Sequence, residues 1–458
     1  MARLKLRRKR AFALAVALAA IVGTLPSASA LAQGAQTRAG EPAEEAGPIT
    51  DDVLEDITDD AGPSAFDAMR PRHLLNPYEY TLRWENGIRL ERNDGLFRLK
   101  VGARLEVDVA GIYGDRAIEN AFGGLGTEWE FRRAWITLGG TIGTRWLYKM
   151  QVDLTGNSAN EDDRSAYVRE IYVAAVGLGP LGTVKLGSVR EPFALNGVTS
   201  SHTLSFQERA LPQTFSPAYN PGIVTENHAF DRRLAWSFGV FYYQNASEDH
   251  SAPIDLTGRL TGLPIYEDEG ERLLHIGASY SHQFRNDFDL RYRRRPETRL
   301  SERYVDTGTS ESDDIDLFGV EVLGIRGPLS ARAEVMLSHV ARPVGDNETF
   351  WSAYAEVAYI LTGETRPYRR ARGLLGRLVP ANPVEWGGGG WGLWELAVRY
   401  SYLDLNHGAT RGGRLGDLGV ALNWYPRAHV RLMANYIHAR RFGIGRSNII
   451  QARVALDF

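Results

Sequence analysis

The stretch GLFRLKVGARLEVDVAGIY, residues 95–113, alternates between two kinds of side chain. Apolar residues stand at every odd position from Phe97 to Val109, and charged residues stand at most of the even positions between them. A period of two residues is typical of a β-strand whose faces meet different surroundings. The stretch therefore predicts a strand that crosses a bilayer at a tilt, with one face toward lipid and the other toward water.

The same alternation recurs to the end of the chain, so we expect an all-β fold, a sixteen-stranded antiparallel transmembrane β-barrel with an inward-folded constriction loop. The number rests on the rule that bacterial single-chain barrels have an even number of strands. Two of the sixteen, 219–229 and 297–306, are included partly to satisfy that rule. The others are expected near 95–113, 129–142, 145–155, 167–176, 182–189, 232–244, 272–284, 314–326, 329–341, 350–362, 391–404, 414–425, 428–440 and 447–458.

The connections divide by length, because short turns of such barrels face the periplasm and long loops face outward. We expect long outer connections at 114–128, 156–166, 190–218 and 245–271. Two long connections are expected on the periplasmic side. One is RNDFDLRYRRRP, residues 285–296, and the other is residues 362–390, which either fold into the barrel mouth or form a free loop.

The N-terminus indicates export. Residues 1–30 combine a basic start, an apolar run and small residues before a cleavage site, as a signal peptide does. Residues 31–80 are acidic and punctuated by Pro and Gly, so we expect a disordered periplasmic linker before the barrel, residues 81–458. The absence of Cys excludes disulfides and thiolate metal sites.

Several long blocks resemble the phosphate-selective porin O/P family. They are EFRRAWITLGGTIGTRWLYKMQVDL (130–154), VKLGSVREPFALNGVTSSHTLSFQER (184–209), YILTGETRPYRR (359–370), WGLWELAVRYSYLDLN (391–406) and GVALNWYPRAHVRLMANYIHAR (419–440). The terminal Phe458, at the end of an alternating strand, is similar to the C-terminal signature of outer-membrane barrels.

The resemblance implies a homotrimeric outer-membrane porin of a Gram-negative-type bacterium that passes small anions, such as phosphate, by passive diffusion. It places Arg132 and Arg133 at the paired pore arginines of the family. Strict alternation lets only one of them face the lumen squarely, and we favour Arg133. The resemblance also makes residues 190–209 the constriction loop, with Arg190, His202 and Arg209. His202 stands where phosphate-selective members carry lysine.

The polar faces of the expected strands carry cations that would line the pore and favour anions. The expected pore-lining residues are Arg98, Lys100, Arg104, Arg133, Lys149, Lys185, Arg233, Arg332, Arg399 and Arg431. The alternative is that these cations pair with carboxylates on the same faces and stiffen the wall. Arginine is also far commoner than lysine after the signal peptide, which suits oxyanion binding, but codon bias produces the same excess.

Other functions remain open at this point. A weakly selective general, carboxylate or sugar porin fits the same fold, and so does a non-conducting barrel that binds through its surface loops. We expect no enzyme, because no catalytic triad spacing or nucleotide or metal motif occurs. We also expect no cofactor and no nucleic-acid partner; the expected partners are small anions, outer-membrane lipid and two further copies of the chain.

Overall fold

The computed structural model describes residues 76, 78–156, 166–243, 253–385 and 387–458. The predicted signal peptide, and the linker up to residue 75, lie outside these residues. All of the described residues belong to one compact unit, Pro48–Phe458. None of its described helices has the length and apolar character needed to cross a bilayer.

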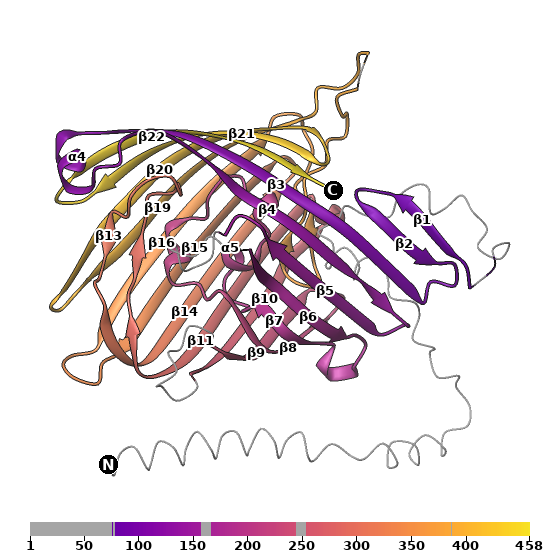
Figure 1. Cartoon of the computed structure of the whole chain (residues 1–458), viewed down its shortest axis with the longest axis horizontal. Helices are drawn as coiled ribbons and strands as arrows, with labels where there is room; N and C mark the ends of the chain where they lie inside the picture. Colours follow the sequence, from indigo (N-terminus) through magenta and orange to yellow (C-terminus); the bar gives the residue numbers. More distant parts are fainter. Residues whose placement is uncertain (1–75, 77, 157–165, 244–252, 386) are drawn as a thin grey trace, which may run out of the picture. The chain divides into compact units, whose positions relative to one another are not determined.

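Sixteen antiparallel strands close into a barrel in the described chain, which confirms the predicted fold class (Figure 1). Closure comes from β22, which pairs with β3 from Ser447↔Gly114 to Asp457↔Arg104. The strands are β3 (Phe97–Gly114), β4 (Gly126–Ile142), β5 (Trp146–Asp153), β6 (Tyr167–Ala175), β7 (Thr183–Arg190), β8 (Tyr219–Ala229), β9 (Leu234–Tyr242), β10 (Ile254–Glu267), β11 (Arg272–Leu290), β14 (Ser310–Arg326), β15 (Leu329–Ala341), β16 (Glu348–Ile360), β19 (Leu393–His407), β20 (Thr410–Arg427), β21 (Val430–Arg441) and β22 (Gly445–Asp457).

Two of the expected assignments are wrong, although the total is right. The long outer loop expected at 245–271 contains a full strand, β10, whose outward row is interrupted by Gly258 and Gly262 and so lacks a clear apolar alternation. The strand expected at 297–306 is absent from the barrel wall. Only the two-residue β13 (Val305–Asp306) forms there, paired with β12 (Arg293–Arg294).

The extra strand also corrects the placement of the arginine-rich segment. Residues 291–309 join β11 to β14, at the barrel end that also carries the loop between β7 and β8. The prediction that this segment lies at the end of the short turns is therefore wrong. Missing β10 reverses the predicted direction of the next strand, β11. The additional strand expected at 297–306 then restores the correct direction for the strands that follow.

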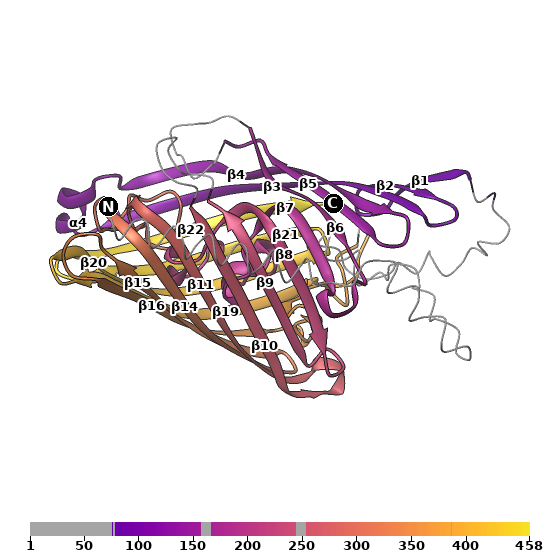
Figure 2. The same cartoon turned by 90° about the horizontal axis from the view of Figure 1, so that it is seen from below.

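The smaller elements lie at the ends of the barrel or inside it. The hairpin of β1 (Tyr80–Trp84) and β2 (Ile88–Arg92) extends the sheet along the start of β3. Figure 2 shows it beyond the barrel, at the end opposite α4 (Arg116–Phe122). The remaining short elements are η3 (Gly179–Leu181), α5 (Leu195–Val198), η4 (Ser201–Thr203), η5 (Leu211–Thr214), η6 (Asp268–Gly270), β17 (Tyr368–Arg369) and β18 (Leu374–Leu375).

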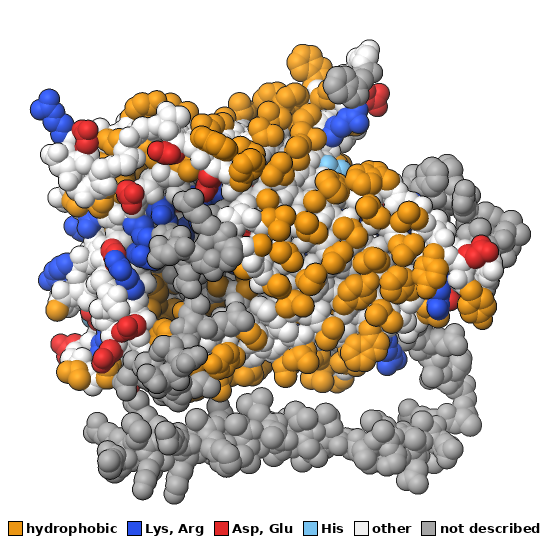
Figure 3. Space-filling view, in the orientation of Figure 1, with side chains coloured by type: hydrophobic (Ala, Val, Ile, Leu, Met, Phe, Trp, Pro, Cys, Tyr) orange, Lys and Arg blue, Asp and Glu red, His pale blue; other side chains and the backbone are white. Residues whose placement is uncertain are grey.

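Apolar side chains cover the outward face of the strands, as Figure 3 shows for one side of the barrel. On β21, for example, Leu432 and Tyr436 are exposed, whereas the next residue after each, Met433 and Ile437, is buried. The inward face is less polar than expected. A large apolar cluster, which includes Ile112, Ile315 and Phe350, lies inside the barrel and receives the loops that fold inward.

Three connecting segments fold into the barrel. In the loop of residues 191–218, the backbone N–H of Asn196 donates to Glu334 of β15 (2.8 Å), and Ser205 donates to Glu395 of β19 (2.7 Å). In residues 291–309, Glu297 accepts a bond from Arg399 of β19 (2.9 Å). In residues 361–392 the side chains of Leu374, Leu375 and Leu378 are buried. This last segment therefore takes the inward course, one of the two expected alternatives.

Candidate functional site

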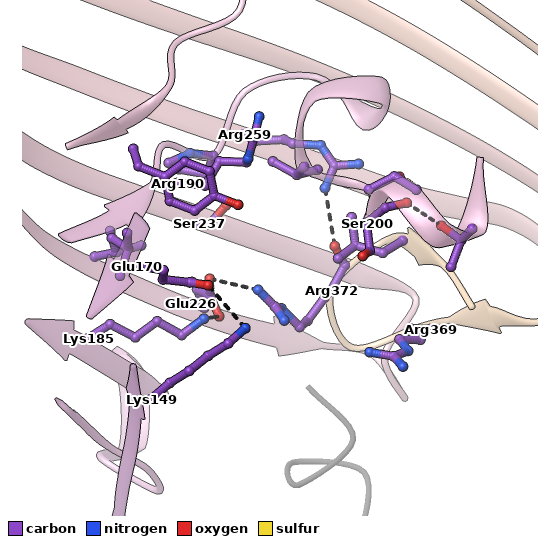
Figure 4. Close-up of a pocket in the computed structure, with 18 of the residues that line it drawn as sticks. Lys149, Glu170, Lys185, Arg190, Ser200, Glu226, Ser237, Arg259, Arg369 and Arg372 are labelled. Carbon is purple, nitrogen blue, oxygen red and sulfur yellow. Dashed lines mark hydrogen bonds and ion pairs between the residues drawn. The ribbon is translucent and has the colours of Figure 1, made fainter. Parts of the chain in front are cut away.

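A cavity of about 150 Å³ lies between the wall of β4–β10 and two inward segments, residues 191–218 and 361–392. Figure 4 shows many of its side chains. Eight cations but only two carboxylates, Glu170 and Glu226, line it. The cationic residues are Lys149, Arg169, Lys185, Arg190, Arg209, Arg259, Arg369 and Arg372. An excess of positive charge in a cleft with low-dielectric walls raises the local concentration of anions.

The two carboxylates hold part of this charge in place (Figure 4). Lys149 faces inward from β5, and its Nζ lies 3.0 Å from Glu170 on β6. Glu226 on β8 binds two cations, Lys185 from β7 at 2.8 Å and Arg372 from the segment 361–392 at 3.4 Å. Glu226 thus joins the barrel wall to an inward segment and partly neutralises the cavity.

Aromatic rings fix the direction of Arg169. Its guanidinium lies 3.7 Å from the ring centre of Trp135 and 4.8 Å from that of Tyr219. Its Nη1 also donates to the side chain of Gln151 (3.3 Å). A stacked guanidinium keeps its charge and its remaining N–H donors, so Arg169 presents a positioned donor to the cavity.

Arg190 and Arg209 carry the feature most suited to an anion. The Nη1 atom of each is buried, and neither finds a hydrogen-bond partner among the described residues. Nη2 of Arg209 donates to the carbonyl of Thr199 (2.6 Å), and the guanidinium of Arg190 lies 4.6 Å from the ring centre of Tyr219. Burial, followed by the like charge of Arg190, lowers the pKa of Arg209. A bound anion would satisfy both donors and offset this repulsion.

A second group of predicted residues lies beside this cavity. Arg104 on β3 contacts two residues of the loop, with Nη2 2.5 Å from Nδ1 of His202 and Nη1 3.3 Å from Ser201. Lys100 and Lys149 line a smaller space next to Arg104. His202 itself lines the main cavity and, together with Arg104, a separate small space beside β21 and β22.

Four other predicted pore residues hold structure together. Arg332 pairs with Glu356 (2.8 Å), and Arg133 pairs with Glu106. Arg399 binds Glu297 of the segment 291–309. Arg431 donates to the carbonyls of His202 (3.1 Å) and Leu204 (2.6 Å). The ion pairs of Arg133 and Arg332 correspond to the alternative of cations that pair with carboxylates of the strands. Arg399 and Arg431 instead bind inward segments.

Two predicted residues lie away from the cavity. Arg98 binds Glu91 of the hairpin (3.0 Å). Arg233 lies at the turn between β8 and β9 and donates to the carbonyls of Leu263 and Tyr266. Both are close to the barrel end that carries the short turns.

The expectation that only one of Arg132 and Arg133 faces inward is wrong. The register of β3 and β4 shifts so that Glu106 pairs with Arg133 and Val107 with Phe131. Arg132 is the extra residue of this β-bulge, which breaks the alternation of side chains. Arg132 consequently reaches Glu208 of the inward loop with two bonds, of 2.7 and 2.9 Å.

Sequence reasoning missed four cavity arginines. Arg259 lies in a segment that the sequence predicts to be a loop, and Arg369 and Arg372 lie on the inward segment, for which the sequence allows two courses. Arg169 stands on an expected strand, but strict alternation places it on the same face as Tyr167 and Ile171. The pattern therefore does not predict that Arg169 faces the lumen. Among the described residues, no group of three His, Cys, Asp or Glu side chains is placed to hold a metal ion.

Comparison with known proteins adds a family to this geometry. A model of the family described as phosphate-selective porin O and P matches residues 99–458. Porin O of Pseudomonas aeruginosa is 26% identical over 412 residues, covering 81% of this chain and 89% of that protein. An uncharacterized protein of Caulobacter vibrioides is 29% identical over 417 residues, covering 83% of this chain and 78% of that protein.

Among solved structures, a loop L8 deletion mutant of OmpT, an outer-membrane protein of Vibrio cholerae, superposes with a TM-score of 0.51 at 11% identity. It covers 79% of this chain and 100% of that chain. Pseudomonas putida OprB gives a TM-score of 0.50 at 8% identity, with 79% and 94% coverage. Both similarities show the fold alone.

Proposed function

Because the chain belongs to the phosphate-selective porin O and P family and is an outer-membrane porin, we propose that the cationic cavity is the part of its channel that selects small anions. The observation that carries this proposal is the pair of buried, unbonded Nη1 atoms of Arg190 and Arg209, in a space with eight cations and two carboxylates. Fixed donors around an aqueous path attract anions and exclude cations of similar size.

Phosphate is the finer proposal. The description of the family as phosphate-selective supports it. Three features of the cavity are suited to phosphate: forked arginine donors, hydroxyl groups of Ser200 and Ser237, and aromatic rings that hold the guanidinium of Arg169. His202 stands where phosphate-selective members of the family carry lysine, and it contributes a full charge only when protonated.

The test is block of chloride current by phosphate in planar bilayers. We expect inorganic phosphate to reduce the chloride conductance of the wild-type channel. The double variant Arg190→Gln, Arg209→Gln should need at least about tenfold more phosphate for the same block, because charge-assisted hydrogen bonds contribute about 1.5–3 kcal/mol each. Arg233→Gln, at a turn outside the cavity, is the control and should behave as the wild type.

Different outcomes favour the other functions. Unchanged phosphate block in the double variant would contradict the cavity as the selecting site. A large conductance with no preference between chloride and potassium would favour a weakly selective porin. A silent bilayer with correctly folded protein would favour a surface-binding barrel.

A homotrimer is also proposed. The strands β5, β6 and β7 have 8, 9 and 8 residues, whereas β11 and β20 have 19 and 18. The short strands form a part of the barrel wall that is shorter than the rest, and it exposes apolar side chains such as Ile171 and Leu186. Neighbouring copies of the chain cover such a surface better than a bilayer of normal thickness does. Light scattering of the detergent-purified protein should give the mass of three chains; the mass of one chain would contradict this.

A further inference from the structure

Three arginines gather on the outward face of the barrel, at the ends of β20–β22 away from the short turns. Arg414, Arg440 and Arg446 are all exposed. They have the same orientation as the exposed apolar row of these strands, which includes Leu418 and Ile450. Figure 3 shows that charged side chains gather at this end of the molecule, beyond the band of hydrophobic ones.

The arginines are close together. Arg440 and Arg446 are directly opposed in the register of β21 and β22. The guanidiniums of Arg414 and Arg440 lie 5.7 and 4.6 Å from the ring centre of the same residue, Phe442. Like charges that face each other across two strands destabilise a sheet unless a counter-charge lies nearby.

No described carboxylate forms an ion pair with any of the three. Asp115, near Arg446, accepts the backbone N–H groups of Ile118 (2.9 Å) and Arg446 (2.8 Å). Asp404, opposite Arg414, accepts from the hydroxyl of Tyr402 (3.3 Å) and from Asn406. Asp404 is the register partner of Arg414, and the charge of Arg446 acts on Asp115, so these two carboxylates offset part of the positive charge.

Three arginines therefore lie on this face against the two carboxylates described above, Asp115 and Asp404. A cluster of arginines directly beside an apolar, lipid-facing row fits an amphiphile with an anionic head.

We propose that Arg414, Arg440 and Arg446 bind the anionic sugar headgroup of a glycolipid in the outer leaflet of the outer membrane. The acyl chains then lie against Leu418, Tyr436 and Ile450, and the phosphate groups of the head accept bonds from the guanidiniums. Charge complementarity and continuity with the lipid-facing surface support this occupant. The negative charge of the headgroup reduces the repulsion between Arg440 and Arg446, and this stabilises the last three strands.

The test uses the mature protein in its native assembly, purified in detergent, and lipid A as the probe. Binding is measured by native mass spectrometry for diphosphorylated lipid A and for its dephosphorylated form. We expect the wild type to prefer the phosphorylated lipid, and Arg440→Gln, Arg446→Gln to bind it at least about tenfold more weakly. The matched control is Arg272→Gln, Arg326→Gln, another pair opposed in register, in which Arg272 already binds Glu267 (2.7 Å).

Four results would overturn the proposal. They are equal binding by the Arg440, Arg446 variant and the wild type, equal binding of the two lipid forms, displacement of the lipid by an equal concentration of inorganic phosphate, and a changed oligomeric mass with unchanged lipid binding. The last would assign the patch to contacts between copies of the chain. Unchanged single-channel conductance of the variant is the measure that its barrel has folded.

Discussion

At the scale of single residues, Glu226 affects both the charge of the cavity and the position of an inward segment. It neutralises part of the charge of Lys185 and Arg372, and it ties the barrel wall to an inward segment. A carboxylate in this position lowers the attraction of the cavity for anions without adding bulk. Glu226 therefore offsets part of the positive charge of the surrounding lysine and arginine side chains. Its removal should increase the preference of the channel for anions.

We predict that Glu226→Gln raises the chloride-to-potassium permeability ratio about twofold, since one charge at a few ångströms from a hydrated ion is worth about 1 kcal/mol or less. The reversal potential in a salt gradient measures this ratio. Glu267→Gln, which removes an exposed carboxylate at a turn, is the control. A lower chloride preference in Glu226→Gln would contradict the role given to this residue.

The inward direction of several cations could be predicted from the sequence, and that of others could not. Lys149 and Lys185 follow from alternation on regular strands. Arg132 does not, because its inward direction depends on a bulge in β4. Arg332 and Arg399 have the right orientation, but their carboxylate partners, Glu356 and Glu297, are brought to them by strand register and loop path, which the local pattern does not contain.

At the scale of elements, the inward loop of residues 191–218 packs against small residues of the barrel wall through Phe206. Phe206 is fully buried against Ala358, Ala397 and Ala421 of three neighbouring strands. A Cβ added at Gly419 would lie 2.7 Å from the ring of Phe206. The wall thus leaves a space that only glycine and alanine provide, and the loop fills it.

We predict that Gly419→Val displaces Phe206 and loosens the loop, at a cost of about 1–3 kcal/mol, as overpacking of a filled core usually does. Single-channel recordings should show larger and noisier current steps, and the temperature at which the barrel unfolds in detergent should fall. Gly324→Val is the matched control, because an added Cβ there meets open space. Identical recordings from both variants would contradict the role given to the packing of Phe206.

The root of the same loop contains a buried carboxyl, that of Glu191. Burial, followed by the neighbouring Asp255, raises the pKa of Glu191 to about 8. Its oxygens accept bonds from Asn220 (2.7 Å) and Thr257 (2.5 Å), and Asp255 itself binds Arg285. Below its pKa, Glu191 is neutral in the folded state, whereas the unfolded chain ionises it above about pH 4.3.

Its contribution to stability therefore falls as pH rises from about 4.3 to 8 and is level above that. We predict that Glu191→Gln removes this part of the pH dependence, so that the variant loses less stability than the wild type between pH 5 and pH 8. Thermal unfolding in detergent at both pH values measures it. An equal loss in both proteins would contradict a neutral Glu191.

The segments between strands explain why the arrangement of loops was harder to predict than the wall. The wall follows from a period of two residues, and this period is visible wherever apolar side chains face lipid. In β10 glycines dilute the pattern, and the missed strand moved residues 291–309 to the wrong end. The inward course of residues 361–392 depends on long-range pairs such as Arg377 with Asp457 (2.5 Å), which local sequence does not encode.

At the scale of the whole molecule, the barrel keeps two kinds of charge apart. Arg133 and Arg332 pair with carboxylates of neighbouring strands, and Arg399 pairs with Glu297 of an inward segment. The cavity beside β4–β10, in contrast, has more cations than carboxylates. The near-neutral total charge of −3 conceals this division. Selectivity therefore depends on where the arginines lie and not on their number.

The most direct test is the reversal potential of the unmodified mature protein in a planar bilayer, across a tenfold gradient of potassium chloride. A cavity with the observed excess of cations predicts a reversal potential displaced toward the equilibrium potential of chloride. A value at zero, or displaced toward the equilibrium potential of potassium, would contradict the account.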